Sequence, residues 1–433
     1  MKFLVPGLCL SRNLGGPAMA LTLVQEVKKK LPEAEFMFAI NPAFYEEEKR
    51  WADYYGAKIV RGDDVLTYAL NTHPILRGVA RVGRWVGRRI PSPREVRSYE
   101  EIHEELMQAY RVSDAIISMR GISYVGDGTR GIREGPISYS DFYYAKKNKK
   151  PFTHFVQSFG PFDDWKVRYF ARKDFNGVDF VPARGRESAQ CCREIIRHPE
   201  KVFDFPDIAL LLPAADEGWT RRYLDQHQLE DRHYILLSPS SVIYHLPGSL
   251  GGSTGTEHAR AFYLMAKEML SQGERLLFLP HMVSRDKSQC DREICLKVLA
   301  FLEKDRQDVS GCHVVEEDLD VWQAKALIAK SKLAVVSRYH AAVAAVSTGT
   351  PVIGIGWNMK YEDLLDYYGI RSMAIDAREE SAEGIAAWVA QKKKEVEQGE
   401  LSVRIRERHE ENVKRVESAF ELLDEWIKSK VKG

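Results

Sequence analysis

Two side chains with complementary chemistry stand two positions apart in LAVVSRYHAAVAAVSTGTPVIGIG, residues 333–356. The guanidinium of Arg338 can hold a phosphate or carboxylate through two hydrogen bonds, and the imidazole of His340 titrates near neutral pH. The segment predicts a strand, a turn, a small-residue helix capped by Ser337, and a second strand. Because ligands gather at the carboxyl ends of parallel strands, we predict that Arg338 and His340 are catalytic. The alternative is an arginine that pairs with a neighbouring acid and a histidine that caps a turn.

Two other expected strand ends carry residues that could bind substrate. His281 follows the strand in LLFLPHMVSRDKSQCD, and its spacing to Asp286 is too generic for a metal site, so we expect no obligatory metal. Arg184 ends the strand in FVPARGRESAQCCREI and could be a second anion clamp. Equally, Arg184, Arg186 and Glu187 could form an exposed cluster of ion pairs.

Two glycine-containing loops near the N-terminus are further candidates for the site. RNLGGPAMALTLVQEV places Asn13 and Gly15 between the first expected strand and a helix, where glycine lets the backbone approach a ligand. The loop lacks the GxGxxG pattern, so a dinucleotide fingerprint is absent, and a plain tight turn is the alternative. ISMRGISYVGDG supplies a second such loop around Gly121. We expect both loops to line the site.

The positions of these candidate site residues are set by strands that alternate with helices. Short apolar runs that end at Gly, Ser or Pro alternate with longer amphipathic segments, which is typical of a parallel α/β sheet. The expected strands include 3–5, 115–117, 152–156, 234–237, 276–279, 334–336 and 352–355.

The length of 433 residues predicts two α/β domains. We expect an N-terminal lobe over 1–205, a linker over 206–232, a C-terminal lobe over 233–380 and a helical extension over 381–433. The extension has apolar residues at helical spacing and is expected to pack across both lobes.

Charge and cysteine content narrow the class of protein. The 63 Lys and Arg balance 62 Asp and Glu to a net charge of +1, so we expect no nucleic-acid partner. The six cysteines include no CxxC pair and are expected to be reduced thiols. No segment approaches about 20 uninterrupted apolar residues, so we expect a soluble cytoplasmic protein.

One basic segment could alter that location. Residues 75–90, ILRGVARVGRWVGRRI, combine five arginines with apolar residues at helical spacing. Such a helix can make peripheral contact with the inner face of an anionic membrane. The alternative is a helix that packs between domains and turns its arginines to solvent.

Taken in order, these segments resemble the polysaccharide pyruvyl transferase family from Asn13 to about Gly369. The strongest part is SRYHAAVAAVSTGTPVIGIGWNMKYEDLLDYYGI, and VQSFGPF at 156–162 and FPDIALLL at 205–212 support it. The resemblance implies two Rossmann-like lobes in the manner of GT-B glycosyltransferases. It also implies transfer of pyruvate from phosphoenolpyruvate to a sugar of a polysaccharide or glycan precursor, as a ketal and without a further cofactor.

The resemblance also implies roles for individual residues. Arg338 and Arg184 would bind the anionic groups of the donor, and His340 would be the acid or base. The N-terminal loops would hold the acceptor sugar, with or without a lipid link. The substrate-binding residues implied in this way are Arg184, His281, Asn13, Gly15, Gly121 and Lys360.

Two departures from the family pattern keep other functions open. Gly16 stands where the family often has an acidic residue, and MRGIS replaces a run of glycines around Gly121. One alternative is a GT-B glycosyltransferase that uses a nucleotide-sugar, with Glu362 or Asp363 as the acid for the donor ribose. The other is a non-catalytic carbohydrate-binding protein of the same fold.

Overall fold

The chain divides into two compact units in a computed structural model, which describes all residues except 12, 63–92, 127–133, 246–253 and 432–433. Unit 1 comprises 1–11, 23–205 and 418–433, and unit 2 comprises 12–22 and 206–417. Each unit is therefore assembled from segments that are separate in the sequence. The basic segment 75–90 lies outside the described residues.

Unit 1 is built on a five-stranded sheet in the order β3-β2-β1-β4-β6, in which all pairs of neighbours are parallel. Aromatic residues fill the core beside it, with Phe142, Phe152, Phe159 and Phe175 all buried. Its elements are β1 (Lys2–Pro6), β2 (Glu35–Ile40), α2 (Tyr45–Tyr55), β3 (Lys58–Arg61), α5 (Pro93–Val112), β4 (Ala115–Ser118), β5 (Ile122–Ser123), α6 (Glu134–Lys147), β6 (Phe152–His154), β7 (Ser158–Phe159), α7 (Trp165–Phe175), β8 (Val181–Arg184), α8 (Arg186–Ile195) and β9 (Val202–Phe205), with 3-10 turns η1 (Pro42–Phe44) and η2 (Pro199–Lys201).

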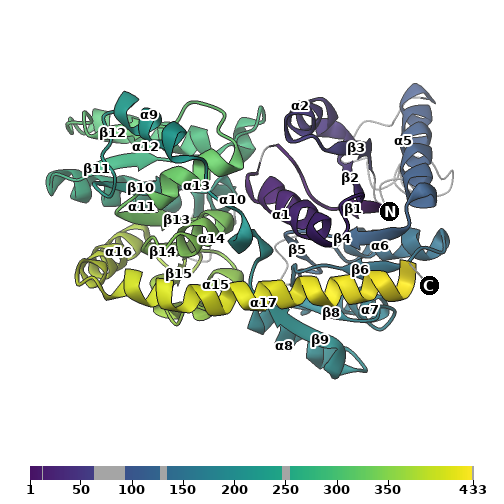
Figure 1. Ribbon diagram of the computed structural model, residues 1–433. Helices are drawn as coiled ribbons and strands as arrows, with labels where there is room; N and C mark the ends of the chain where they lie inside the picture. The colour runs from purple at the N-terminus through teal and green to yellow at the C-terminus, as the bar shows by residue number, and fades with distance from the viewer. Residues whose placement is uncertain (12, 63–92, 127–133, 246–253, 432–433) are drawn as a thin grey trace. The chain divides into compact units, whose positions relative to one another are not determined.

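Unit 2 is built on a six-stranded sheet in the order β12-β11-β10-β13-β14-β15, again with parallel neighbours throughout. Helix α14 packs against β13 and β14, and α11 packs against β11 (Figure 1). Its elements are η3 (Ile208–Leu211), α9 (Glu217–Gln226), β10 (Tyr234–Ser238), α10 (Ser241–His245), α11 (Thr254–Ser271), β11 (Arg275–Phe278), η4 (Lys287–Gln289), α12 (Asp291–Lys304), β12 (Cys312–Val314), α13 (Val321–Ala329), β13 (Leu333–Val336), α14 (Tyr339–Ser347), β14 (Val352–Gly356), α15 (Lys360–Asp366), η5 (Arg371–Met373), β15 (Ala374–Asp376) and α16 (Ala382–Glu397).

The central strands of unit 2 are apolar on both faces. Every residue of β13 and of β14 is buried, as expected for parallel strands that are covered on both sides. The strand order is that of a doubly wound Rossmann-like sheet, in which the order reverses between β10 and β13. The apolar runs predicted as strands are all strands, because burial on both faces leaves an unmistakable run of hydrophobic residues.

Two helices contribute residues to both units. Helix α1 (Gly15–Lys30) begins in unit 2 and ends in unit 1, and α17 (Glu400–Val431) does the same. In unit 2, Asn412 of α17 donates a hydrogen bond to the carbonyl of Tyr367 at 3.1 Å. In unit 1, the ring of Phe420 lies 5.0 Å from that of Phe155. The C-terminal helix therefore packs in both lobes, as expected.

The division of the chain differs from the expected domain limits in three places. The expected extension over 381–433 is divided, because unit 2 runs to Glu417 and unit 1 includes the residues from Ser418 onward. Residues 206–232, expected to be a linker, form η3 and α9 within unit 2, because their apolar residues Ile208, Leu210 and Leu224 are buried there. Residues 12–22 join unit 2 although they lie within the expected N-terminal lobe.

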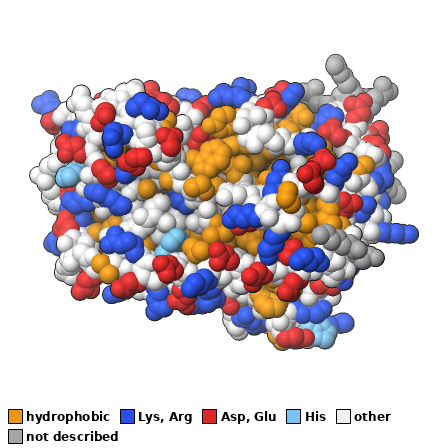
Figure 2. All heavy atoms as spheres, viewed as in Figure 1, with side chains coloured by type: hydrophobic (Ala, Val, Ile, Leu, Met, Phe, Trp, Pro, Cys, Tyr) orange, Lys and Arg blue, Asp and Glu red, His pale blue; other side chains and the backbone are white. Residues whose placement is uncertain are grey.

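Among the described residues, no helix is both long enough and apolar enough to cross a membrane. Acidic and basic side chains are interspersed over the face drawn in Figure 2.

Candidate active site

The predicted catalytic residues lie at the carboxyl ends of strands in unit 2. Strand β13 ends at Val336 and leads to His340 in the first turn of α14, while His281 follows the end of β11. This is the edge of the sheet at which the strand order reverses, where open α/β sheets bind ligands. The N-cap of α14 is Arg338, without a side-chain cap, so the prediction that Ser337 caps the helix is wrong.

A buried carboxylate stands beside the imidazole of His340. The Nε2 atom of His340 lies 3.4 Å from Oδ2 of Asp207, and the side chain of Asp207 is fully buried. The other carboxylate oxygen of Asp207 accepts a hydrogen bond from the backbone N–H of Ala209 at 2.8 Å, which fixes its position. A carboxylate held in this way orients an imidazole and stabilises it after it takes up a proton.

The N-terminal loop approaches the opposite edge of the same ring. A Cβ atom at Gly15 would overlap Nδ1 of His340, so only glycine fits beside the imidazole. The side-chain oxygen of Asn13 accepts a hydrogen bond from the N–H of Gly15 at 3.2 Å, and the N–H of Leu14 donates to the carbonyl of His281 at 3.2 Å. The structure therefore brings the predicted residues Asn13 and Gly15 to His340 and His281.

A small cavity of about 20 Å³ lies next to this pair of histidines, with room for about one water molecule. Burial lowers the pKa of His281 well below its ordinary value, with His340 and Arg338 adding to the effect, so His281 is neutral at neutral pH. The cavity is lined by Leu14, Ala18, Ala209, Leu212, His281, Val321, Lys325, His340, Val343 and Ala344.

Lys325, from α13, is a buried amine that lines this cavity and that sequence reasoning missed. Its ammonium group donates a hydrogen bond to the carbonyl of Leu212. Burial lowers the pKa of Lys325 to about 7, while the charge of Asp207 acts in the opposite direction. A lysine with this pKa can exchange a proton near neutral pH.

Arg338 is held by an acid rather than turned freely toward a ligand. Its Nε and Nη2 atoms donate to the two carboxylate oxygens of Asp291 at 2.8 and 2.5 Å, and Nη2 also donates to Ser241 at 2.8 Å. Both side chains of the ion pair are buried. The structure thus corrects the expectation of a bidentate anion clamp and shows the arginine–acid pair that the spacing left as the alternative.

The remaining candidates in unit 1, Arg184 and Gly121, lie together, and Arg184 is buried. Arg184 is 2% exposed, which excludes the alternative of an exposed ion-pair cluster for this residue. Its guanidinium donates to the carbonyl of Gly121 and, at 3.1 Å, to the hydroxyl of Ser158. The structure therefore joins Arg184 to the loop of Gly121 within unit 1.

Lys360 is surrounded by aromatic rings at the start of α15 in unit 2. Its ammonium group lies 4.8 Å from the ring centroid of Trp357 and 5.5 Å from those of Tyr339 and Tyr361. Cation–π attraction holds the amine close to the residues that follow β14. Next to it, Glu362 pairs with Arg371, so this acid is engaged on the protein itself.

Comparison with solved structures defines the class of fold. The chain is similar to the S. aureus MnaA–UDP structure, with 13% identity, a TM-score of 0.60 and coverage of 99% of this chain and 96% of that one. It is also similar to the UDP-GlcNAc 2-epimerase of Neisseria meningitidis and to a ugt transferase of Siraitia grosvenorii. Identities are 12% and 11%, TM-scores are 0.56 and 0.54, and each match covers 99% of this chain and 100% of the other. The protein has the two-lobed α/β fold of GT-B glycosyltransferases and epimerases.

The family follows from the sequence. The model of the polysaccharide pyruvyl transferase family matches residues 13–359, so the chain belongs to this family. A curated relative is the amylovoran biosynthesis protein AmsJ of Erwinia amylovora, which is 23% identical over 268 residues. The match covers 61% of this chain and 62% of that relative.

Proposed function

We propose that this protein transfers pyruvate from phosphoenolpyruvate to a sugar of a polysaccharide or glycan precursor and forms a ketal. The observation that carries the proposal is the imidazole of His340, held between the carboxylate of Asp207 and the backbone of Gly15 at the end of β13. Family membership over residues 13–359 supports this chemistry, and a relative named for amylovoran biosynthesis supports a polysaccharide acceptor.

The first step is a proton transfer. His340, as the imidazolium, protonates the methylene carbon of phosphoenolpyruvate, and the adjacent carbon becomes cationic. A sugar hydroxyl attacks this carbon and gives its proton back to His340, so the histidine ends the cycle as it began. Asp207 stabilises the imidazolium at each stage because its carboxylate lies beside the ring, 3.4 Å from Nε2.

The second step releases phosphate and closes the ring. The C–O bond to the phosphate breaks, and a second hydroxyl of the same sugar attacks the same carbon. The proton of that hydroxyl leaves with the phosphate, so atoms and charge balance over the cycle. Arg338 acts in this scheme as a positioning residue, since its pair with Asp291 and its bond to Ser241 connect the ends of β10, β11 and β13.

The test is release of phosphate from phosphoenolpyruvate with a panel of sugar acceptors. We expect acceptor-dependent release that falls about 10²- to 10⁴-fold in His340→Gln, the usual contribution of a general acid. His233→Gln is the matched control, because the side chain of His233 is 71% exposed. Circular dichroism of each variant checks that the fold is retained.

Two outcomes would contradict the proposal. Undiminished release in His340→Gln would remove this residue from the chemistry. Transfer from a nucleotide-sugar, together with no binding of phosphoenolpyruvate, would instead assign the protein to the glycosyltransferases that share its fold.

A further inference from the structure

Two histidines and a glutamate meet at the edge strand of the unit 2 sheet. His227 caps the C-terminal end of α9, His313 lies on β12, and Glu317 follows the end of β12. Strands β11 and β10 separate β12 from β13, which leads to His340. The cluster is therefore distinct from the candidate active site, and a ligand bound by it is independent of the proposed function.

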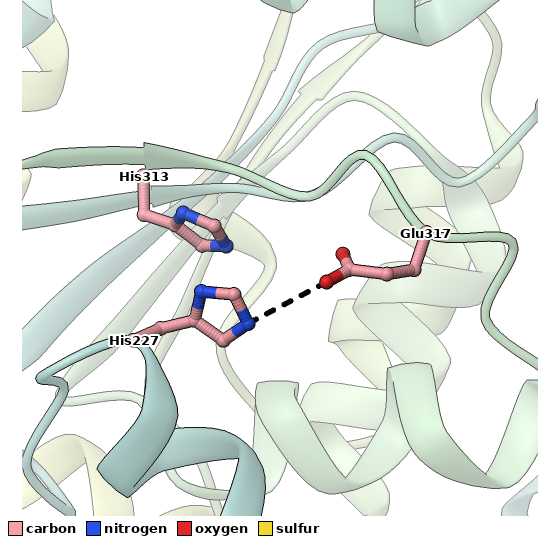
Figure 3. A group of neighbouring side chains, drawn as sticks. All are labelled: His227, His313 and Glu317. Atoms are coloured by element: carbon pink, nitrogen blue, oxygen red, sulfur yellow. Dashed lines mark ion pairs between the residues drawn. The ribbon is translucent and has the colours of Figure 1, made fainter.

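The three side chains point toward one another (Figure 3). The imidazole rings of His227 and His313 lie 4.0 Å apart between centroids, and Nε2 of His227 lies 3.5 Å from a carboxylate oxygen of Glu317. One nitrogen or oxygen atom from each residue lies within 4.8 Å of those of the other two.

These spacings suit a four-coordinate metal ion. Metal–ligand distances of about 2.1 Å in a tetrahedral site place ligand atoms about 3.4 Å apart. The distance between His227 and Glu317 already matches this spacing. Distances that involve Glu317 can shorten by rotation of its side chain, which is 46% exposed.

One imidazole nitrogen of the cluster has no hydrogen-bond partner in the described part of the chain. The Nε2 atom of His227 is buried and makes no hydrogen bond, which is costly for an imidazole nitrogen. The hydroxyl of Tyr223 lies 3.3 Å from Nε2 of His313 and 3.3 Å from Glu317, where it can support two ligands at once.

We propose that His227, His313 and Glu317 bind a divalent transition-metal ion of the zinc class. Two imidazole nitrogens and one carboxylate oxygen suit zinc, whereas magnesium and calcium prefer all-oxygen sites. The partial exposure of Glu317 leaves water to complete the coordination. The ion would link the end of α9 to the edge strand β12. This proposal differs from the expectation, made from the sequence, that the protein holds no obligatory metal.

The test measures zinc binding to the full-length chain without a histidine tag, after treatment with a chelator. We expect one zinc ion per chain by equilibrium dialysis, and an affinity that falls more than about 10-fold in His227→Gln and His313→Gln. Glu317→Gln, a nearly isosteric change at a partly exposed side chain, keeps the fold and should also weaken binding. Zinc should raise the unfolding temperature of the wild type but not of these variants.

Matched controls make the result decisive. Glu316→Gln changes the exposed neighbour of Glu317, and His233→Gln removes an exposed histidine, so both should bind zinc as the wild type does. Equal affinity in Glu317→Gln and Glu316→Gln would overturn the proposal. Loss of the zinc in His281→Gln instead of His313→Gln, or no zinc retained at micromolar concentration, would also overturn it.

Discussion

At the scale of single residues, the imidazole of His340 leaves no room for a side chain at position 15. Gly15→Ala would place a methyl group where Nδ1 of His340 lies, so the ring would have to turn away from Asp207. We expect a loss of acceptor-dependent phosphate release comparable to that of His340→Gln, measured with the same assay. Gly311→Ala is the control, because a Cβ atom there meets only ordinary contacts of 3.4 Å or more. Equal activity of both variants would contradict the described position of the ring.

The buried amine of Lys325 predicts a dependence of stability on pH. The folded protein loses this proton near pH 7, because burial lowers the pKa of Lys325 to about 7, whereas an unfolded lysine keeps it to about pH 10.4. Between these values the unfolded state binds one more proton. The free energy of unfolding contributed by this residue therefore rises with pH, by about 1.4 kcal/mol per pH unit.

Urea denaturation of the wild type and of Lys325→Met, at several pH values, isolates this contribution. The free energy of unfolding of the wild type minus that of the variant should increase from about pH 7 to about pH 10 and be flat below about pH 6. Parallel curves across the whole range would show that Lys325 has an ordinary pKa.

The positions of His340 and His281 could be predicted from the sequence, whereas the acids that contact His340 and Arg338 could not. Both histidines follow apolar runs, so their place at strand ends follows from the strands alone. Asp207 and Asp291 are distant in sequence from the residues that they contact, and nothing in local spacing links Asp291 to Arg338. Arg338 was therefore predicted to bind an anionic ligand, because its counter-ion Asp291 was not recognised. The ion pair between the two residues indicates a positioning role instead.

At the scale of elements, the alanines of α14 let this helix approach the sheet closely. Ala345 is fully buried where α14 packs against β13 and β14. Ala345→Leu should lower the free energy of unfolding by about 1–3 kcal/mol, because a close-packed site must strain to accept three more carbon atoms.

A second alanine offers the matched comparison. Ala390 of α16 lines a cavity of about 360 Å³, together with residues of α11, so Ala390→Leu has room for its side chain. Urea denaturation should show a smaller loss of stability for this variant than for Ala345→Leu. The reverse order would mean that α16 is packed more tightly against its neighbours than α14 is.

The elements were largely predictable because strands buried on both faces leave continuous apolar runs. The ends of helices were less predictable. Serine is a favoured N-cap residue and Ser337 directly precedes the start of α14, but the N-cap is Arg338. The metal-binding cluster was not predictable, because His227 and His313 come together only when the end of α9 meets the edge strand β12.

At the scale of the whole molecule, α17 supplies side chains to unit 1 from the far end of the chain. The indole N–H of Trp426 donates to Asp179 at 3.0 Å, and the side chain is 4% exposed. Trp426→Ala should cost about 3–5 kcal/mol, the usual range for a buried tryptophan. Hydrogen exchange should accelerate in the strands of unit 1 and change less in those of unit 2.

Trp165 is the control for this change, because it also belongs to unit 1 but is 71% exposed. Trp165→Ala should leave the exchange of both sheets close to that of the wild type. Uniform acceleration in both units after Trp426→Ala would show that they unfold as one cooperative body.

The interleaved segments of the two units constrain the order of events during synthesis. Residues 418–431 complete unit 1, and the ribosome makes them only after all of 206–417 has emerged. While the second unit is being translated, Phe155 and Phe180 of the first unit therefore lack their ring contacts with Phe420 and Trp426. A nascent chain of this kind exposes hydrophobic surface for the whole interval, which is the condition in which chaperones bind.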